Sequence, residues 1–348
     1  MTGRPFTSHV SRFTETKPLV VLVGPTAVGK SQIAIHVAKT LETEVLTADS
    51  RQVYRGMDVG TDKPSLKERK GVPHRLIDLV EPDQPFNTGE FRRQAVLEIT
   101  RLHREGRVPL VVGGTGLYVR TLLHGLCEGP PADWEFRRGL ERDADANGAD
   151  WLYRQLAQVD PESTRRLHPN DRVKIIRALE VHHLLGRPLS GEHKRHAFAA
   201  TPFTPLLIGL ARERQALYRR IDERVELELA KGLVEETRGL MAKGYGRQLG
   251  SMKALGYKQM AGSLAGDYDY DEAVRLLKRD TRHFAKRQLT WFRKEPGIRW
   301  MTIEDGEPAA QTAARVVAEA RRFLAQLEAD KLTGGKLTKG APNSLSAY

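Results

Sequence analysis

The chain has 348 residues, of which 40% are hydrophobic and 29% charged, and its formal net charge is +12 at pH 7. This composition is ordinary for a folded globular protein, and no apolar run approaches the roughly 20 residues that span a bilayer, so we expect no membrane segment. The single cysteine, Cys127, excludes an internal disulfide and a multi-cysteine zinc module, which is typical of a cytoplasmic protein. The positive charge favours nucleic acid as a partner, although a merely solvated basic surface would give the same total.

The first strong pattern along the chain is a strand, a glycine-rich turn and a helix. Residues 19–23 form an apolar β-branched run, and apolar residues at helical spacing follow from Ile33 to Leu41. Between them, GPTAVGKS fits the phosphate-loop pattern GxxxxGK[ST] in full. The backbone N–H groups of such a loop converge on a phosphate, the lysine adds charge and the serine hydroxyl reaches Mg²⁺. The sequence predicts a di- or triphosphate site made by Gly24, Pro25, Thr26, Ala27, Val28, Gly29, Lys30 and Ser31, with Mg²⁺ at Ser31.

Two further strand ends carry polar or small residues. A second strand over 44–47 leads to Asp49, and a third over 108–112 leads through two glycines to Thr115. Ligands of open α/β sheets bind at the carboxyl ends of strands, so we expect Asp49 to be catalytic and the Thr115 hydroxyl to donate to a phosphate oxygen. As alternatives, Asp49 caps a helix or holds Mg²⁺, and the glycines with Thr115 form only a tight turn. Between these strands we expect a loop over 54–64, a short strand over 73–79 with a structural His74, and a helix over 91–104.

The second half of the chain changes from a mixed helix and strand pattern to a helical one and then returns to a strand. Residues 129–202 are charged, helical in pattern and strand-free, which indicates an insertion into an α/β domain, and a strand over 205–210 then returns to the sheet. The next helix begins in an arginine cluster, from which Arg214 is expected at the diphosphate. Residues 278–294 interleave basic and aromatic residues, which suits RNA binding, although some of the aromatic residues belong to a core. We expect a core domain of 17–128 and 203–325, an insertion of 129–202, and disordered tails at 1–16 and 331–348.

Seven motifs occur in a specific order: GPTAVGKS, ADSRQVYRGMDVGTDKP, PHRLIDLVEP, VVGGTGLYV, HPNDRVKIIRALEV, ALGYKQM and AKRQLTWFR. On these motifs, residues 18–301 resemble the bacterial tRNA dimethylallyltransferases. The resemblance implies a P-loop NTPase-like parallel sheet with flanking helices and a helical insertion. It also implies transfer of a dimethylallyl group from its diphosphate to N6 of adenosine 37, beside the tRNA anticodon, with Mg²⁺. A monomer is the default expectation.

The resemblance also assigns roles to residues. Asp49 would be the base and Thr115 would lie at the reacting centre, while Arg51 stands where relatives commonly carry a small or apolar residue. The implied tRNA contacts are Asp49, Ser50, Arg51, Gln52, Thr115, Arg137, Val173, Lys174, Ile175, Ile176, Arg177, Lys253, Gly256, Tyr257, Lys258, Lys286, Arg287, Gln288, Trp291 and Arg293.

The chemistry of such a transfer agrees with these residue types. The diphosphate leaves as an anion, which the phosphate loop would stabilise, and a carboxylate that takes the N6 proton helps by about 10²–10⁴-fold. Three alternatives stay open: a phosphate-loop kinase that acts on a small metabolite, prenyl transfer to free adenine nucleotides, and a non-catalytic RNA-binding module. The kinase leaves the basic late helices unexplained, and the RNA-binding module leaves residues 24–31 unexplained.

Overall fold

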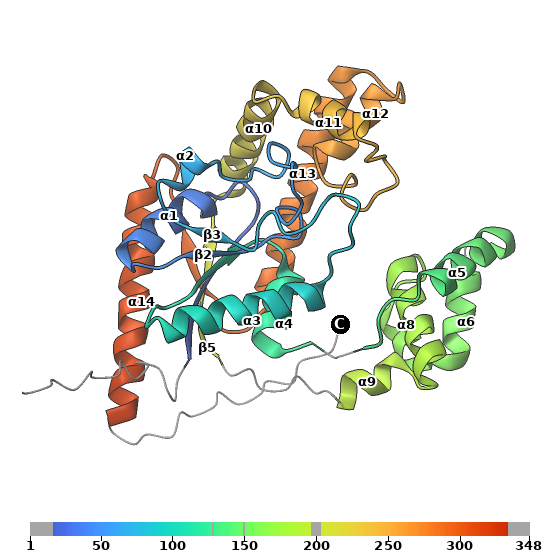
Figure 1. Ribbon diagram of the computed structural model, residues 1–348, viewed down its shortest axis with the longest axis horizontal. Coiled ribbons are helices and arrows are strands. Elements are labelled where there is room, and N and C mark those ends of the chain that lie inside the picture. Colours follow the sequence, from blue (N-terminus) through green and yellow to red (C-terminus); the bar gives the residue numbers. More distant parts are fainter. Residues whose placement is uncertain (1–16, 127–128, 149, 196–202, 333–348) are drawn as a thin grey trace, which may run out of the picture. The chain divides into compact units, whose positions relative to one another are not determined.

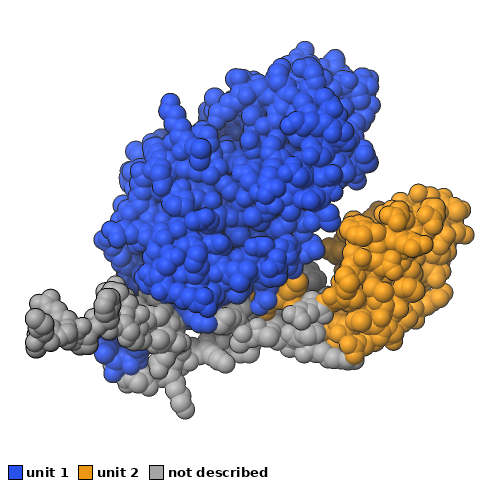
Figure 2. Space-filling view, in the orientation of Figure 1, with its two compact units in different colours: residues 1–123, 201–336 blue, residues 124–200, 337–348 orange. Residues whose placement is uncertain are grey.

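The computed structural model describes residues 17–126, 129–148, 150–195 and 203–332. The density of contacts divides the chain into two compact units, residues 1–123 with 201–336 and residues 124–200 with 337–348 (Figure 2). Cys127 and the tails at 1–16 and 333–348 lie outside the described residues. None of the described helices is long and apolar enough to cross a bilayer.

The first unit is built on a six-stranded sheet in the order β3-β2-β4-β1-β5-β6, in which every pair of neighbours is parallel. Its strands are β1 (Pro18–Val23), β2 (Val45–Ala48), β3 (His74–Arg75), β4 (Leu110–Gly113), β5 (Thr204–Ala211) and β6 (Arg299–Thr302). The predicted parallel α/β sheet is confirmed. Two differences are found: the expected strand over 73–79 is only two residues long, and the edge strand β6 was not predicted.

The helices that cover the two faces of this sheet include α1 (Lys30–Thr40), α14 (Ala309–Leu332), α3 (Thr88–Arg104) and α4 (Gly116–His124) (Figure 1). Side chains alternate along β1, so Val20 and Leu22 share a core with α1 and α14, whereas Leu19, Val21 and Val23 share one with α3 and α4. Both faces of the strand are therefore buried, which is why residues 19–23 are continuously apolar. Helix α14 was not predicted, and it includes two residues of the expected tail at 331–348.

The remaining helices of the first unit lie above the carboxyl ends of the strands, and all but the first of them, which buries no residue, contribute to a third core. They are α2 (Leu66–Arg69), α10 (Arg214–Ala230), α11 (Leu233–Ala242), α12 (Tyr257–Leu264) and α13 (Tyr270–Arg293). Val53 and Met57, from the loop after β2, pack in this core with Val225 of α10, Tyr257 of α12 and Leu277 of α13. The loop after β2 is thereby fixed to helices that lie more than 160 residues later in the chain.

The second unit contains the helices α5 (Trp134–Asn147), α6 (Trp151–Val159), α7 (Pro161–Arg166), α8 (Arg172–Leu185) and α9 (Leu189–Arg195), and no strand among its described residues. It has a core of its own, in which Leu152, Leu156, Ile175 and Leu179 are buried. Glu180 is fully buried on α8 and accepts hydrogen bonds from the Asp133 backbone and two arginines. These bonds satisfy a carboxylate that would be costly to bury alone.

Candidate active site

The phosphate loop joins β1 to α1. Gly29 caps the helix with a φ of 109°, a conformation that favours glycine because it has no Cβ. The Lys30 ammonium group donates hydrogen bonds to the carbonyl oxygens of Gly24 (3.0 Å) and Pro25 (2.8 Å), so the lysine lies along the inside of the loop. The Thr26 N–H donates to Gln288 (2.8 Å), so an anion in the loop would be bound by the remaining N–H groups and the N-terminus of α1.

The charge on Lys30 depends strongly on its surroundings. Burial lowers the pKa of Lys30 to about 8, an effect that the carboxylates of Asp49 and Asp62 oppose and the Arg224 guanidinium reinforces. Lys30 is therefore a cation that titrates near physiological pH. A diphosphate bound beside it would favour the charged form.

The ends of β2 and β4 bring Asp49 and Thr115 together. Ala48 lies opposite Gly113 in the sheet, and a Cβ on Gly113 would lie 2.0 Å from the Ala48 oxygen, so only glycine allows this approach. The Ser50 N–H donates to Thr115 Oγ1 (3.0 Å). The Asp49 carboxylate accepts a hydrogen bond from the Arg51 N–H (2.8 Å), which fixes its orientation at the strand end. The two residues predicted to be catalytic thus share one edge of the sheet.

A cavity of about 540 Å³ lies at this edge, within the first unit. Its walls include Thr26, Lys30 and Ser31 of the phosphate loop, the strand-end residues Asp49, Ser50, Arg51, Gln52, Gly114 and Thr115, the loop residues Gly60, Thr61, Asp62 and Lys253, and the helical residues Arg224, Lys258, His283, Phe284, Arg287 and Gln288. The cavity therefore joins the predicted phosphate site to the predicted catalytic residues.

One functional residue, Arg224 of α10, was missed by sequence reasoning. Its guanidinium donates to Thr26 Oγ1 (2.6 Å) and to Glu228 (2.6 Å), and it lies 3.4 Å from Asp62. The predicted Arg214 does not line the cavity and instead donates to the Tyr218 hydroxyl. The signal for Arg224 was present, since it lies next to Val225 in the buried stripe of α10 that runs from Ala216 to Glu228.

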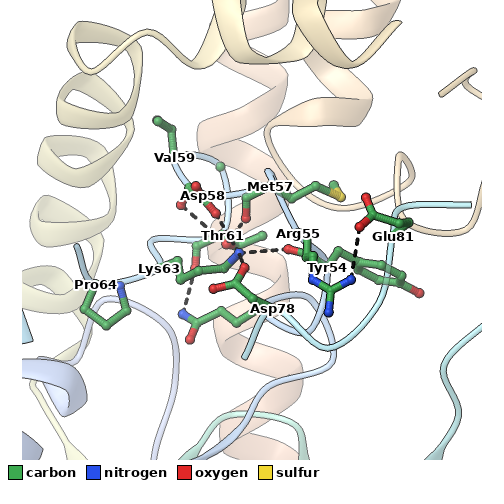
Figure 3. A network of polar contacts seen from close by, with 12 residues as sticks. Tyr54, Arg55, Met57, Asp58, Val59, Thr61, Lys63, Pro64, Asp78 and Glu81 are labelled. Atoms are coloured by element: carbon green, nitrogen blue, oxygen red, sulfur yellow. Dashed lines mark hydrogen bonds and ion pairs between the residues drawn. The ribbon is translucent and has the colours of Figure 1, made fainter. Parts of the chain in front are cut away.

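The loop over 54–64, expected to be ordered, is fixed from within by Lys63. The Lys63 side chain is 3% exposed. Its ammonium group donates to the backbone oxygen of Tyr54 (2.8 Å) and to the carboxylates of Asp58 (2.6 Å) and Asp78 (2.6 Å), as Figure 3 shows. Gln52, predicted to contact tRNA, is buried and donates instead to the backbone oxygens of Thr61 and Asp62. These bonds hold Asp62 against the cavity.

Residues predicted to contact tRNA in the first unit fall into two groups. Exposed side chains are found at Lys253, Lys258, Lys286, Arg287, Trp291 and Arg293. Tyr257 and Gly256 are buried, and the Tyr257 hydroxyl donates to Glu236, which also accepts from the N–H groups of residues 58–60. Gln288 is also buried. Gln288 lines the cavity and the other two residues do not, and the tRNA contacts expected of all three stay predictions.

The second unit shows a similar division. Val173 and Lys174 are exposed, whereas Ile175 and Ile176 belong to the core of the unit and cannot present their side chains to RNA. Arg137 and Arg177 both bind the buried Glu180. The Arg137 guanidinium also lies 5.0 Å from the centre of the Trp134 ring. The charge of both arginines is therefore already paired within the unit.

The donor set of the cavity fits Mg²⁺. Among the described residues, no group of three or more His, Cys, Asp and Glu side chains could hold a metal by itself. Mg²⁺ does not need such a group, because it binds through one or two carboxylates together with substrate phosphates. The Ser31 hydroxyl and the Asp49 and Asp62 carboxylates line the same cavity. His74 also lines it, but one ring nitrogen is engaged by the Val72 oxygen (3.0 Å) and burial lowers its pKa.

Comparisons with known proteins agree with this geometry. The family model for IPP transferase matches residues 52–295. A relative named tRNA dimethylallyltransferase 2, from Geotalea uraniireducens, is 51% identical over 283 residues, which are 81% of this chain and 91% of the relative. A tRNA dimethylallyltransferase from Geobacter sulfurreducens is also 51% identical over the same shares of the two chains.

Two solved structures are similar over most of the chain. The full-length tRNA isopentenylpyrophosphate transferase from Bacillus halodurans is 37% identical, with a TM-score of 0.68 over 92% of this chain and all of that one. A eukaryotic dimethylallyltransferase described as acting on tRNA is 26% identical, with a TM-score of 0.73 over 93% of this chain and 82% of that one. The chain therefore belongs to the IPP transferase family, whose members include the bacterial tRNA dimethylallyltransferases.

Proposed function

We propose that this protein transfers a dimethylallyl group from dimethylallyl diphosphate to N6 of adenosine 37 in tRNA, which gives N6-(dimethylallyl)adenosine and diphosphate. One observation carries the proposal: a single cavity is lined by a phosphate loop on one side and by Asp49 and Thr115 on another. A donor that leaves as a diphosphate and an acceptor that loses a proton need these two sets of groups side by side.

The phosphate-loop side of the cavity would bind the donor. As the bond between the allylic carbon and oxygen breaks, negative charge grows on the diphosphate. The loop N–H groups, Lys30 and Arg224 would stabilise this charge, since Arg224 reaches Thr26 Oγ1 (2.6 Å) and Lys30 lines the loop. Mg²⁺ bound beside Ser31 would supply further Lewis-acid stabilisation of the same charge.

The strand-end side would bind the acceptor. Adenine N6 is a weak nucleophile because its lone pair is delocalised into the ring. As N6 forms its bond to the allylic carbon, the Asp49 carboxylate would take the N6 proton. Thr115 Oγ1 accepts the Ser50 N–H (3.0 Å), and its hydroxyl donates to Ser50 Oγ over a long 3.4 Å contact that a phosphate oxygen of the donor would replace.

The acceptor base must leave the anticodon loop to enter the cavity. Such flipping costs a few kcal/mol, which stacking and phosphate contacts can offset. Lys253, Lys258 and Arg287 are exposed and also line the cavity, so they could hold RNA phosphates at its mouth. The proposed partner is the tRNA anticodon stem-loop, and the proposed state of the enzyme is a cytoplasmic monomer.

The proposal is tested by prenyl transfer in vitro. The purified protein is incubated with Mg²⁺, labelled dimethylallyl diphosphate and unmodified tRNA that carries adenosines at positions 36 and 37, with AMP and ATP as parallel acceptors. A tRNA with guanosine at position 37 is the matched control. We expect label only in the first tRNA. Label in AMP would favour a nucleotide prenyltransferase, and ATP consumption without transfer would favour a kinase.

The role of Asp49 is tested by Asp49→Asn, which keeps the size of the side chain and removes its basicity. We expect kcat to fall by about 10²–10⁴-fold from the loss of proton removal, with a smaller loss of donor affinity because Asp49 also supports the charge of Lys30. Asp83→Asn, at an exposed position outside the cavity, is the control. A kcat close to that of the wild type in Asp49→Asn would remove Asp49 from the mechanism.

A further inference from the structure

Gln288 is a polar residue on the buried side of α13. The other buried residues of this helix include Leu277, Ala285 and Phe292, so Gln288 occupies a position in an otherwise mainly apolar stripe, and it is 7% exposed. A buried amide is costly unless both of its ends are hydrogen-bonded. Both ends of Gln288 are bonded, and the two partners belong to different loops.

The side chain of Gln288 bridges the two halves of the cavity. Its Oε1 accepts a hydrogen bond from the Thr26 N–H of the phosphate loop (2.8 Å), and its Nε2 donates to the Gly114 oxygen (2.9 Å), next to Thr115. A Cβ on Gly114 would lie 2.4 Å from Gln288 Nε2, so the glycine is what allows the amide to approach. One side chain thus spans from the phosphate site to the strand end that carries Thr115.

The next turn of α13 is fixed to the same strand end. A Cβ on Gly116 would lie 2.2 Å from Trp291 Cδ1, so the indole lies directly on the backbone after Thr115. Lys286 and Arg287, the two residues immediately before Gln288, are exposed. Helix α13 therefore exposes basic side chains on one face, and its buried face contacts both the phosphate loop and the end of β4.

We propose that Gln288 is a positioning residue that sets the distance between the bound diphosphate and the acceptor groups Asp49 and Thr115. This inference rests on the proposed function and deepens it. Group transfer needs the reacting atoms about 3–3.5 Å apart, and a displacement of ~1 Å can cost about 10²-fold in rate. The two hydrogen bonds of Gln288 would maintain that spacing, although Gln288 itself does not touch the reacting atoms.

The test compares two substitutions that break the bridge in different ways. Gln288→Met keeps the length and the unbranched shape but bonds to neither loop. Gln288→Glu still accepts the Thr26 N–H but cannot donate to the Gly114 oxygen, and it adds negative charge beside the diphosphate. Gln311→Met, on an exposed position of α14, is the matched control. Steady-state transfer kinetics are measured together with hydrogen exchange of the Thr26 amide.

For Gln288→Met we expect kcat to fall by about 10–100-fold with both KM values within about threefold of the wild type, and the Thr26 amide to exchange at least about tenfold faster. For Gln288→Glu we expect protection of that amide to persist while KM for the donor rises. Gln311→Met should behave as the wild type. A lower melting temperature with unchanged kcat would make Gln288 a packing residue only, and a rise confined to KM for tRNA would make it an RNA contact.

Failure of the proposal can be distinguished from failure of the proposed function. If the wild-type protein prenylates no acceptor, the proposed function is wrong, and hydrogen exchange still reports on the bridge in the same variants. If the wild type is active and the Thr26 amide of Gln288→Met exchanges at the wild-type rate, the bridge does not hold the phosphate loop and the inference is wrong.

Discussion

At the scale of single residues, Lys30 links the phosphate loop to the solution pH. Burial lowers the pKa of Lys30 to about 8, and a bound diphosphate favours its charged form. Donor affinity should therefore reach its maximum well below pH 8. As the pH rises through 8, the affinity should fall by up to about tenfold per pH unit. Calorimetry with a thiodiphosphate analogue of the donor, whose terminal phosphate ionises near pH ~6, would measure this.

The control for this prediction is Lys30→Gln, which should bind the analogue more weakly and with little dependence on pH in the same range. A wild-type affinity that stays constant from about pH 7 to pH 10 would contradict the prediction, because Lys30 would then keep its ordinary pKa.

Sequence reasoning located individual residues unevenly. Lys30 and Asp49 were placed in one cavity in advance, because the phosphate-loop motif and a strand end carry their own backbone geometry. Gln52 and Gln288 are expected at the RNA; both are buried and line the cavity, Gln52 bonded to the backbone of the adjoining loop and Gln288 to two loops far away in the sequence. Such bonds depend on which loops meet in space, and Arg224 was missed for the same reason.

At the scale of elements, the segment from Arg212 through the first two turns of α10 supports the phosphate loop by hydrogen bonds to its carbonyl oxygens. Arg212 Nε donates to the Val28 oxygen (3.1 Å) and Arg220 Nε to the Ala27 oxygen (3.0 Å). Two guanidinium groups thus hold the loop carbonyls away from the site, which keeps the N–H groups turned toward an anion. Neither arginine lines the cavity.

We expect Arg220→Met to weaken binding of the donor analogue by about tenfold, since hydrogen bonds to charged groups contribute roughly 1.5–3 kcal/mol. Arg219→Met is the matched control, because Arg219 is the preceding residue and pairs with the exposed Asp305 at the surface. Titration calorimetry measures both variants. Equal affinities for the two variants would show that α10 does not support the loop.

Helices and strands were predictable from the sequence where one or both of their faces are buried. The strands over 19–23 and 205–210 read as apolar runs because helices cover both faces of the sheet there. Strand β6 escaped prediction because it lies at the edge of the sheet and Arg299, Trp300 and Thr302 are exposed, so no buried pattern marks it. Helix α14 does carry a buried stripe at Ala313, Val316, Val317 and Ala320, which periodicity could have revealed.

At the scale of the whole molecule, the net charge of +12 has a measurable consequence. If the exposed basic residues contact RNA phosphates, tRNA affinity should fall linearly with salt on logarithmic axes, and each lost contact should reduce the slope by about 0.7–0.9. We expect this reduction for Lys286→Gln and none for Lys39→Gln, an exposed position at the end of α1. Filter binding at several salt concentrations would show it, and identical slopes would exclude Lys286 from the RNA interface.

The place of β1 in the sheet has a consequence for the synthesis of the protein. The strand pairs with β4 on one side and with β5 on the other, and Pro18 meets Thr204 only after residues 124–200 of the second unit have been made. At translation rates of about 5–20 residues per second, this edge of the nascent sheet waits roughly 10–40 s for its partner. During that time the unpaired backbone groups along this apolar strand can pair with another strand by mistake, so a chaperone that covers β1 at the ribosome would favour correct folding.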